Sequence, residues 1–305
     1  MLTLSDGIRK IIMKLFLFFI ILWGFSIDTF GASATKEGDS LRRRSPVSRA
    51  VADADGMPKE EGHTVYDESG CCGQCSRKSQ DCCYQILANT CWGCIISQFE
   101  PGRIQAMNLL DLREGEQALF VGEGAGHDFA HLPEGIDLGR VHAFDFSSEM
   151  VKHAKIKARE VGIPEDNVFK GDAQRLPFEE RRFDKIFFPL SLASIPNPQL
   201  AIAEAERVLN PGGRIVVFEK LLDEGVEVSC GKWFCNLFTS CIFADVTRNL
   251  PEMIGETPLK IMDYRSVRDL RGCASCFEGS YRLAMLGRSE DHPDLVSKRA
   301  VLEEE

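Results

Sequence analysis

The chain lacks an excess of positive charge: 36 lysines and arginines stand against 46 aspartates and glutamates, and the formal net charge is −10. An acidic chain repels phosphate backbones, so nucleic acid is not expected as a partner unless a local basic patch overrides the sum. The one basic cluster, Arg42–Arg44, lies in a polar stretch and is interpreted as a solvated run of charges.

A long apolar run is missing as well. The N-terminal run Leu15–Phe25 follows Lys10 and Lys14; it is short for a membrane span and fits the h-region of a signal peptide. Small residues follow at Ala32–Ala34, where a signal peptidase needs them. Residues 1–34 are therefore expected to be a signal peptide, with a membrane-associated signal anchor as the alternative. Either interpretation predicts that the chain enters the secretory or endomembrane route, or a plastid route if the source is an alga.

Composition divides the rest of the chain. Residues 35–70 have few large apolar side chains and are expected to form a disordered linker. Residues 71–98 hold seven of the 12 cysteines and are expected to form a cysteine-rich lid segment. A folded domain is expected over residues 99–288, followed by a charged tail at 289–305.

Short apolar runs alternate with amphipathic helical segments from residue 117 onward. This alternation predicts an α/β fold with a mainly parallel sheet. Ser147 or Ser148 is expected to cap one helix, and Pro198 to begin another that ends near Leu209, before a break at 210–213. Strands are expected at Gln117–Val121, Val141–Asp145, Asn167–Lys170, Asp184–Phe188 and Arg214–Glu219, with a final pair within Leu259–Gly287.

A glycine-rich turn, Gly122–Gly126, directly follows the first expected strand and is expected to lead into a helix. Glycine allows a sharp turn and lets a ligand approach the backbone without a Cβ in the way. Dinucleotide-binding loops read G-x-G-x-x-G, whereas here the third glycine comes one residue early. This spacing favours a ligand without a pyrophosphate at the turn.

Two aspartates follow later strands. Asp145 ends the second strand, where a carboxylate can accept both hydroxyls of a ribose; the alternative is that it favours the dipole of the next helix. Asp172 follows the third strand, where it can accept an adenine amino group while the N–H of Ala173 donates to a ring nitrogen; the alternative is an Asx-turn.

Linked motifs resemble a known family. Gly171–Phe178, Phe183-Asp184 and Arg207–Arg214 stand in the order found in class I S-adenosylmethionine-dependent methyltransferases, closest to the type 11 branch that includes ubiquinone and menaquinone methyltransferases. The segment Phe99–Arg103 also resembles bacterial-type phosphatidylethanolamine N-methyltransferases. The similarity covers roughly residues 99–220.

The resemblance implies a doubly wound, Rossmann-like sheet of seven strands, the last of them antiparallel, that binds S-adenosylmethionine. The chain departs from the family pattern at one position, because the family usually has an acidic residue where this chain has Phe120. The segment Phe188–Leu190 is implied to face the methyl donor and acceptor. The expected cofactor-binding residues are Gly122, Glu123, Gly124, Gly126, Asp145, Phe146, Asp172, Ala173 and Pro189.

The expected reaction is in-line methyl transfer to a small-molecule or lipid acceptor, for which alignment and exclusion of water matter most. His127, Asp128 and His131 are candidate bases, although exposed polar residues of a helix are the preferred interpretation for each. Two other functions stay open: a non-catalytic binding or redox protein with this fold, and a nicotinamide oxidoreductase, which the early third glycine disfavours.

The cysteine pattern allows several chemistries. Cys72 and Cys75, with Cys91 and Cys94, have the spacing of a four-cysteine zinc site. A signal peptide and an even number of cysteines favour disulfides over zinc and over free or redox-active thiols. The pairing cannot be read from the sequence.

Overall fold

The computed structural model describes residues 96–222, 248–255, 257–271 and 281–291. The expected signal segment, the linker, residues 71–95 of the cysteine-rich segment and the tail from residue 292 onward lie outside the described residues. No helix within the described part of the chain has both the length and the apolarity to cross a bilayer.

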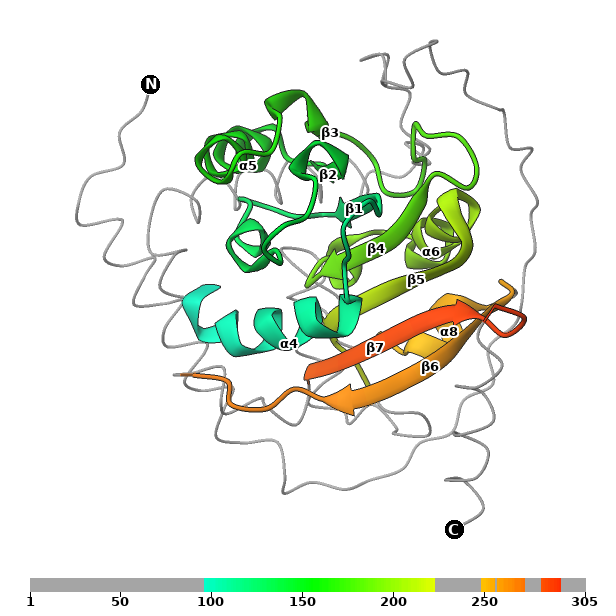
Figure 1. Cartoon of the computed structure of the whole chain (residues 1–305). Coiled ribbons are helices and arrows are strands. Elements are labelled where there is room, and N and C mark those ends of the chain that lie inside the picture. Colours follow the sequence, from blue (N-terminus) through cyan, green and yellow to red (C-terminus); the bar gives the residue numbers. More distant parts are fainter. Residues whose placement is uncertain (1–95, 223–247, 256, 272–280, 292–305) are drawn as a thin grey trace, which may run out of the picture.

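A seven-stranded sheet forms the centre of the domain, in the order β3-β2-β1-β4-β5-β7-β6 (Figure 1). All neighbours from β3 to β5 are parallel, and β7 is antiparallel to both β5 and β6. The predicted doubly wound sheet with an antiparallel last strand is thus confirmed. The strands are β1 Ala118–Val121, β2 Val141–Asp145, β3 Val168–Lys170, β4 Phe183–Pro189, β5 Leu209–Lys220, β6 Leu259–Ser266 and β7 Tyr281–Arg288.

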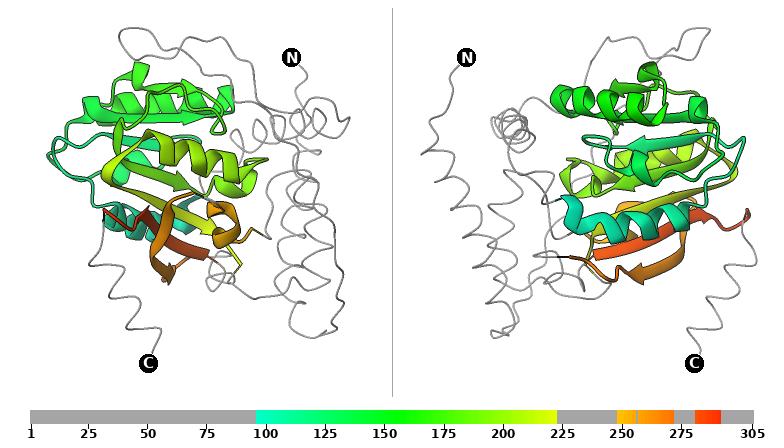
Figure 2. Two further views of the ribbon diagram at one scale, coloured as in Figure 1. Left: turned by 90° about the vertical axis from the view of Figure 1, so that its right-hand side faces the viewer. Right: turned by 60° about the vertical axis from the view of Figure 1, so that its left-hand side comes forward.

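Helices cover both faces of the sheet. Helices α4 (Glu100–Leu110) and α5 (Ser148–Val161) share one apolar cluster with the sheet, while α6 (Pro198–Val208) and α8 (Leu250–Ile254) share the cluster on the other face. The views in Figure 2 show α4 running alongside β5 and β7. Short 3-10 helices are η1 (Ser97–Phe99), η2 (Asp128–His131), η3 (Leu138–Arg140), η4 (Glu165–Asn167) and η5 (Leu192–Ser194).

Strand β1 explains why the layers assemble in this way. Leu119 and Val121 are buried in the cluster on the α6 side, whereas Ala118 and Phe120 are buried on the α4 side. A strand that is covered on both faces must be apolar at every position, which is why it reads as a continuous apolar run in the sequence.

Two elements differ from the sequence-based expectation. The turn Gly122–Gly126 leads only into the four-residue η2, because Pro133 and Gly135 follow and oppose a longer helix. The break expected at residues 210–213 lies inside β5 as a bulge, since the pairing with β4 moves from Phe183↔Leu209 to Lys185↔Arg214.

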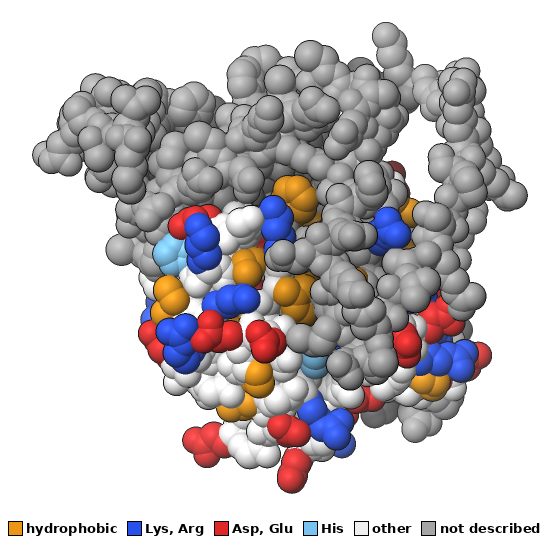
Figure 3. All heavy atoms as spheres, turned by 90° about the horizontal axis from the view of Figure 1, so that it is seen from above, with side chains coloured by type: hydrophobic (Ala, Val, Ile, Leu, Met, Phe, Trp, Pro, Cys, Tyr) orange, Lys and Arg blue, Asp and Glu red, His pale blue; other side chains and the backbone are white. Residues whose placement is uncertain are grey.

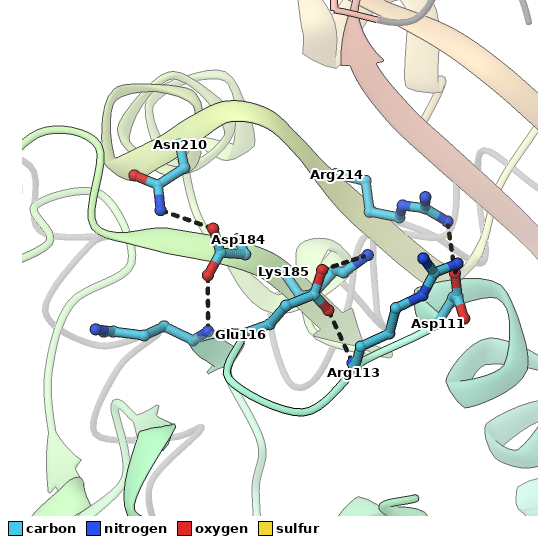
Figure 4. A network of polar contacts seen from close by, with 8 residues as sticks. Asp111, Arg113, Glu116, Asp184, Lys185, Asn210 and Arg214 are labelled. Carbon is cyan, nitrogen blue, oxygen red and sulfur yellow. Dashed lines mark hydrogen bonds and ion pairs between the residues drawn. The ribbon is translucent and has the colours of Figure 1, made fainter. Parts of the chain in front are cut away.

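A polar network holds the amino ends of the strands (Figure 4). Asp184 of β4 accepts hydrogen bonds from the Gln117 backbone N–H and from the Asn210 side chain, both at 2.8 Å. Lys185, which is buried, pairs with Glu116 at 3.5 Å. The network therefore connects β1, β4 and β5 at the end of the sheet where these strands begin.

Charges of both signs are interspersed on the described part of the face seen in Figure 3. Lysine and arginine side chains lie next to aspartates and glutamates there, so no field of a single sign builds up over that part of the surface.

Candidate functional site

A cavity of about 220 Å³ lies at the carboxyl ends of the parallel strands. The loops after β1 and β4 meet there, at the point where the strand order reverses, which is the usual ligand site of an open α/β sheet. Its lining residues are Ile96, Phe99, Arg103, Gly122–Ala125, His127, Phe144–Ser147, Met150, Gly171–Ala173, Pro189–Ser191, Ser194 and Ile195. Eight of the nine expected cofactor-binding residues are among them.

The glycine loop forms one wall of the cavity. Gly122 and Gly124 have φ angles of +72° and +64°, which other residues adopt only with strain. A Cβ on Gly122 would lie 2.5 Å from Cβ of Ser191, whereas a Cβ on Gly124 would meet no atom within 4 Å. Gly124 therefore leaves its backbone open to a ligand, and Gly122 allows the loops after β1 and β4 to approach each other.

Gly126 is the expected site residue that does not line the cavity. Its φ is +79°, and a Cβ there would lie 2.9 Å from the ring of Phe129 and 3.1 Å from Cα of Ala154. This glycine thus allows η2 to pack closely against α5, and its contribution to the site is structural.

Asp145 connects the loops that follow β1 and β2. Its Oδ2 accepts from the Gly124 N–H at 2.9 Å, and its Oδ1 accepts from the Ser147 N–H at 2.8 Å. These bonds fix the carboxylate in the wall of the cavity. The side chain is half-buried, which keeps it accessible to a ligand.

Asp172 lines the cavity and combines a turn contact with an oxygen that has no partner among the described residues. Oδ1 accepts from the backbone and side-chain N–H groups of Gln174, both at 3.0 Å, so the Asx-type turn that was the alternative to a ligand-binding role is present. Oδ2 is buried and has no hydrogen-bond partner among the described residues. A buried acceptor without a partner is costly, and a donor from a ligand in the cavity would satisfy it.

The three candidate bases differ in their surroundings. His127 lines the cavity, but its Nδ1 lies 2.8 Å from Nζ of Lys157, and burial together with that charge lowers its pKa to about 3. Asp128 is fully buried in an ion pair with Arg103, and His131 does not line the cavity. None of the three is well placed to accept a proton from a molecule in the cavity.

The end of β4 lines the cavity beside the glycine loop. Pro189, Leu190 and Ser191 line the cavity there, whereas Phe188 is fully buried in the core. Leu190 has a φ of +54°, and its N–H donates to the carbonyl of Phe218 at 2.7 Å. A non-glycine residue in this conformation is strained, and such strain is common at functional sites.

Sequence reasoning did not assign a site role to Phe99 and Arg103 of the segment that precedes the sheet. Both line the cavity, although they lie about twenty residues before the glycine loop. Gly102 explains their position, because a Cβ there would lie 2.5 Å from Cζ of Phe218, so only glycine lets α4 lie this close to β5.

No cluster of three or more metal-binding side chains is present among the residues that the structure describes. The candidate zinc ligands Cys72, Cys75, Cys91 and Cys94 lie outside that part of the chain.

By sequence, the glycine loop and the strands around it are similar to one protein family. Residues 119–217 match the family model described as "Methyltransferase domain". A demethylmenaquinone methyltransferase from Oceanobacillus iheyensis is 32% identical over 118 residues, covering 38% of this chain and 50% of that protein. An uncharacterized transposon protein from Streptomyces fradiae is 40% identical over 114 residues, covering 37% of this chain and 32% of that protein. The chain thus spans half or less of the length of these curated relatives.

Solved structures share the fold. A methyltransferase in complex with the Trm112 activator from Haloferax volcanii has a TM-score of 0.53 at 19% identity, covering 67% of this chain and 95% of that one. A geranyl diphosphate C-methyltransferase from Streptomyces coelicolor, bound to S-adenosyl-L-homocysteine, has a TM-score of 0.51 at 18% identity, covering 61% and 75%. Residues 119–217 thus match a methyltransferase domain by sequence, and the sheet order with its antiparallel last strand is the fold that the described domain shares with these solved methyltransferases.

Proposed function

We propose that this chain binds S-adenosylmethionine in the cavity and transfers its methyl group to a small-molecule acceptor. The observation that carries the proposal is that the glycine loop, Asp145 and Asp172 line a single cavity, although they follow three different strands. The family match over residues 119–217 supports the same reaction.

The cavity has groups that fit each part of adenosine. The unpartnered Oδ2 of Asp172 suits the adenine amino group, and the half-buried carboxylate of Asp145, which lines the cavity, suits the ribose hydroxyls. The open space at Gly124 allows the chain of the cofactor to pass over the backbone. When bound, S-adenosylmethionine supplies a methyl group on a sulfonium, whose departure as a neutral thioether needs no proton donor.

The protein's own part in the reaction is alignment and exclusion of water. Because the three candidate bases are poorly placed, the chain is expected to act by holding the acceptor in line with the methyl group. Acceptors that are already nucleophilic, such as an amine, a phenolate or an electron-rich carbon, fit this arrangement best.

We propose an acceptor with an apolar part. The lining of the cavity also includes the apolar residues Phe99, Leu190 and Ile195. Relatives are named for demethylmenaquinone and geranyl diphosphate as substrates. A lipid amine and a quinone-like phenol are the two acceptor classes to compare.

The test is transfer of a radiolabelled methyl group from S-adenosylmethionine into a lipid extract and into a polar metabolite extract. Label in the lipid fraction is expected with the natural chain. Asp145→Asn is expected to reduce the label about tenfold or more, through loss of a charge-assisted hydrogen bond, and Asp166→Asn at an exposed site is the matched control. Absence of label from both fractions would favour the non-catalytic alternative.

We also propose that residues 1–34 direct the chain into the secretory or endomembrane route. The support is the sequence pattern alone: two lysines, an apolar run and small residues at positions 32–34. The full chain with a C-terminal fluorescent reporter should localise to endomembranes, and the same fusion without residues 1–34 should not. Identical distribution of the two fusions would refute this proposal.

A further inference from the structure

A buried amide side chain lies directly behind Asp172. Gln174 is only 7% exposed, and it is not among the residues that line the cavity, although Asp172 and Ala173 are. A buried amide is normally hydrogen-bonded at both its oxygen and its nitrogen, so its partners show which groups it holds in place. Gln174 has one partner on each side of the cavity wall: Asp172 after β3 and Asn197 before α6.

Both hydrogen bonds to Oδ1 of Asp172 come from Gln174. The backbone N–H and the side-chain Nε2 each donate to this oxygen at 3.0 Å. The terminal torsion of an aspartate has a broad preference, so a single donor restricts the plane of the carboxylate only weakly. The second donor, from the side chain, fixes Oδ1 toward the turn and thereby leaves Oδ2 as the oxygen for a ligand.

Asn197 determines which end of the Gln174 amide faces Asp172. The backbone N–H of Asn197 donates to Oε1 of Gln174 at 3.1 Å. Because the amide oxygen is taken by this donor, the NH₂ group must lie on the other side, where it can only donate. The side chain of Asn197 in turn accepts from the Leu200 N–H at 3.2 Å and caps α6. The start of a helix therefore holds the donor to Asp172.

The rest of the same loop is also bound to α6. Glu204 accepts from the Leu176 N–H at 2.8 Å. Arg207 donates to the carbonyls of Leu176 and Phe178, at 3.0 and 2.9 Å. Since the loop is fixed along the helix, the orientation of Asp172 exists before a ligand enters the cavity, and binding does not have to supply the cost of ordering it.

An oriented carboxylate distinguishes purines by the group at their C6 atom. The 6-amino group of adenine donates a hydrogen bond, and a carboxylate acceptor makes that bond charge-assisted. The 6-oxo group of hypoxanthine only accepts, so it would face another acceptor and be rejected. A carboxylate that is free to rotate can turn away from the 6-oxo group, so the discrimination depends on how firmly Asp172 is held.

We propose that Gln174 is a positioning residue that makes the site selective for a 6-amino purine over a 6-oxo purine, by holding Oδ2 of Asp172 toward the base. The inference rests on the proposed function, because the purine is that of S-adenosylmethionine. Gln174 itself acts only through Asp172, since it does not line the cavity.

The experiment measures two affinities by isothermal titration calorimetry. S-adenosylhomocysteine carries adenine, and S-inosylhomocysteine differs from it only in carrying hypoxanthine. The natural chain is expected to bind the adenine ligand at least about tenfold more tightly. Gln174→Met, which retains the length of the side chain without its amide, should reduce this ratio about three- to tenfold. A general loosening of the loop would weaken both ligands alike and leave the ratio unchanged.

Two further variants make the comparison specific. Gln174→Glu keeps an acceptor for the Asn197 N–H and removes only the amide donor to Asp172, so the ratio should fall here too. Asn210→Leu is the matched control, because it removes an amide donor to the carboxylate of Asp184, at the opposite end of the sheet. Its ratio should stay within about twofold of that of the natural chain. Binding of S-inosylhomocysteine verifies that each variant has folded.

Several outcomes overturn the inference. An unchanged ratio in Gln174→Met, or a fall that Gln174→Glu does not share, removes the assigned role of Gln174. A fall of the same size in Asn210→Leu shows that the effect is not specific to Asp172. Equal affinity of the natural chain for the two ligands means that the site does not select a 6-amino group, while the proposed function survives. Failure of the natural chain to bind either ligand refutes the proposed function as well.

Discussion

Replacing Glu219 by glutamine should remove a large part of the pH dependence of stability. Glu219, near the end of β5, is 3% exposed, and burial raises its pKa from 4.5 to about 7. Its Oε2 accepts from the Ala193 N–H at 3.0 Å and its Oε1 from the Lys220 N–H at 2.9 Å, and both bonds oppose the increase.

The magnitude follows from the difference between the two pKa values. A shift from 4.5 to about 7 corresponds to about 3 kcal/mol in the free energy of unfolding. Because the folded protein holds this proton more tightly than the unfolded chain, the stabilisation is complete below pH 4.5. It declines as the pH rises and is lost above pH 7. A glutamine side chain does not titrate. It has one acceptor oxygen where Glu219 has two, so one of the two backbone N–H groups loses its partner, which lowers the free energy of unfolding by about 1–2 kcal/mol at every pH.

The assay is urea denaturation of the natural chain and of Glu219→Gln at several values between pH 4.5 and pH 8, at constant ionic strength. The quantity to follow is the free energy of unfolding of the natural chain minus that of the variant, in which all other titrations cancel. This difference should fall by about 3 kcal/mol across the range. Glu114→Gln, at an exposed position, is the control. A difference that stays constant, or that rises with pH, would refute the reasoning.

Three further substitutions test the packing and the polar network. Gly126→Ala places a Cβ 3.1 Å from Cα of Ala154 at a φ of +79°, so thermal unfolding should show a loss of about 1–3 kcal/mol; an unchanged melting temperature would contradict the close packing. Gly102→Ala should destabilise by a similar amount because of the ring of Phe218, and Phe218→Leu in the same chain should recover part of the loss; simple additivity would argue against their contact. Asp184→Asn weakens the acceptor for two donors and should lower the free energy of unfolding by about 1–3 kcal/mol in urea, while leaving the affinity for S-adenosylhomocysteine unchanged.

Much of the sheet could be predicted because its signals are local. A parallel strand that is covered on both faces is apolar throughout, and Gly122–Gly126 marks the turn that follows the first of these strands. The positions of Asp145 and Asp172 followed from their places after strands, since the carboxyl ends of parallel strands meet at one edge.

The features that could not be predicted depend on contacts distant in the sequence. Arg103 reaches the cavity only because Gly102 lets α4 lie against Phe218, which is more than one hundred residues away in the chain. The high pKa of Glu219 arises from burial by several elements at once. In contrast, the replacement of the expected helix by η2 has a local cause that the sequence already contains, because Pro133 and Gly135 follow η2 and oppose a longer helix.

Strand β4 has different neighbours at its two ends. At residues 184 and 185 it is fixed by carboxylate, amide and ammonium contacts, and at residues 189–191 it bends over the cavity. About 20 Å of extended chain separates these ends. The stability of the sheet and the choice of ligand in the cavity are therefore governed by different residues of the same strand. A protein engineer can therefore first stabilise the end of β4 at residues 184 and 185. Substitutions of Leu190 and its neighbours that lower stability, but change which acceptor the cavity binds, would then still leave the protein folded.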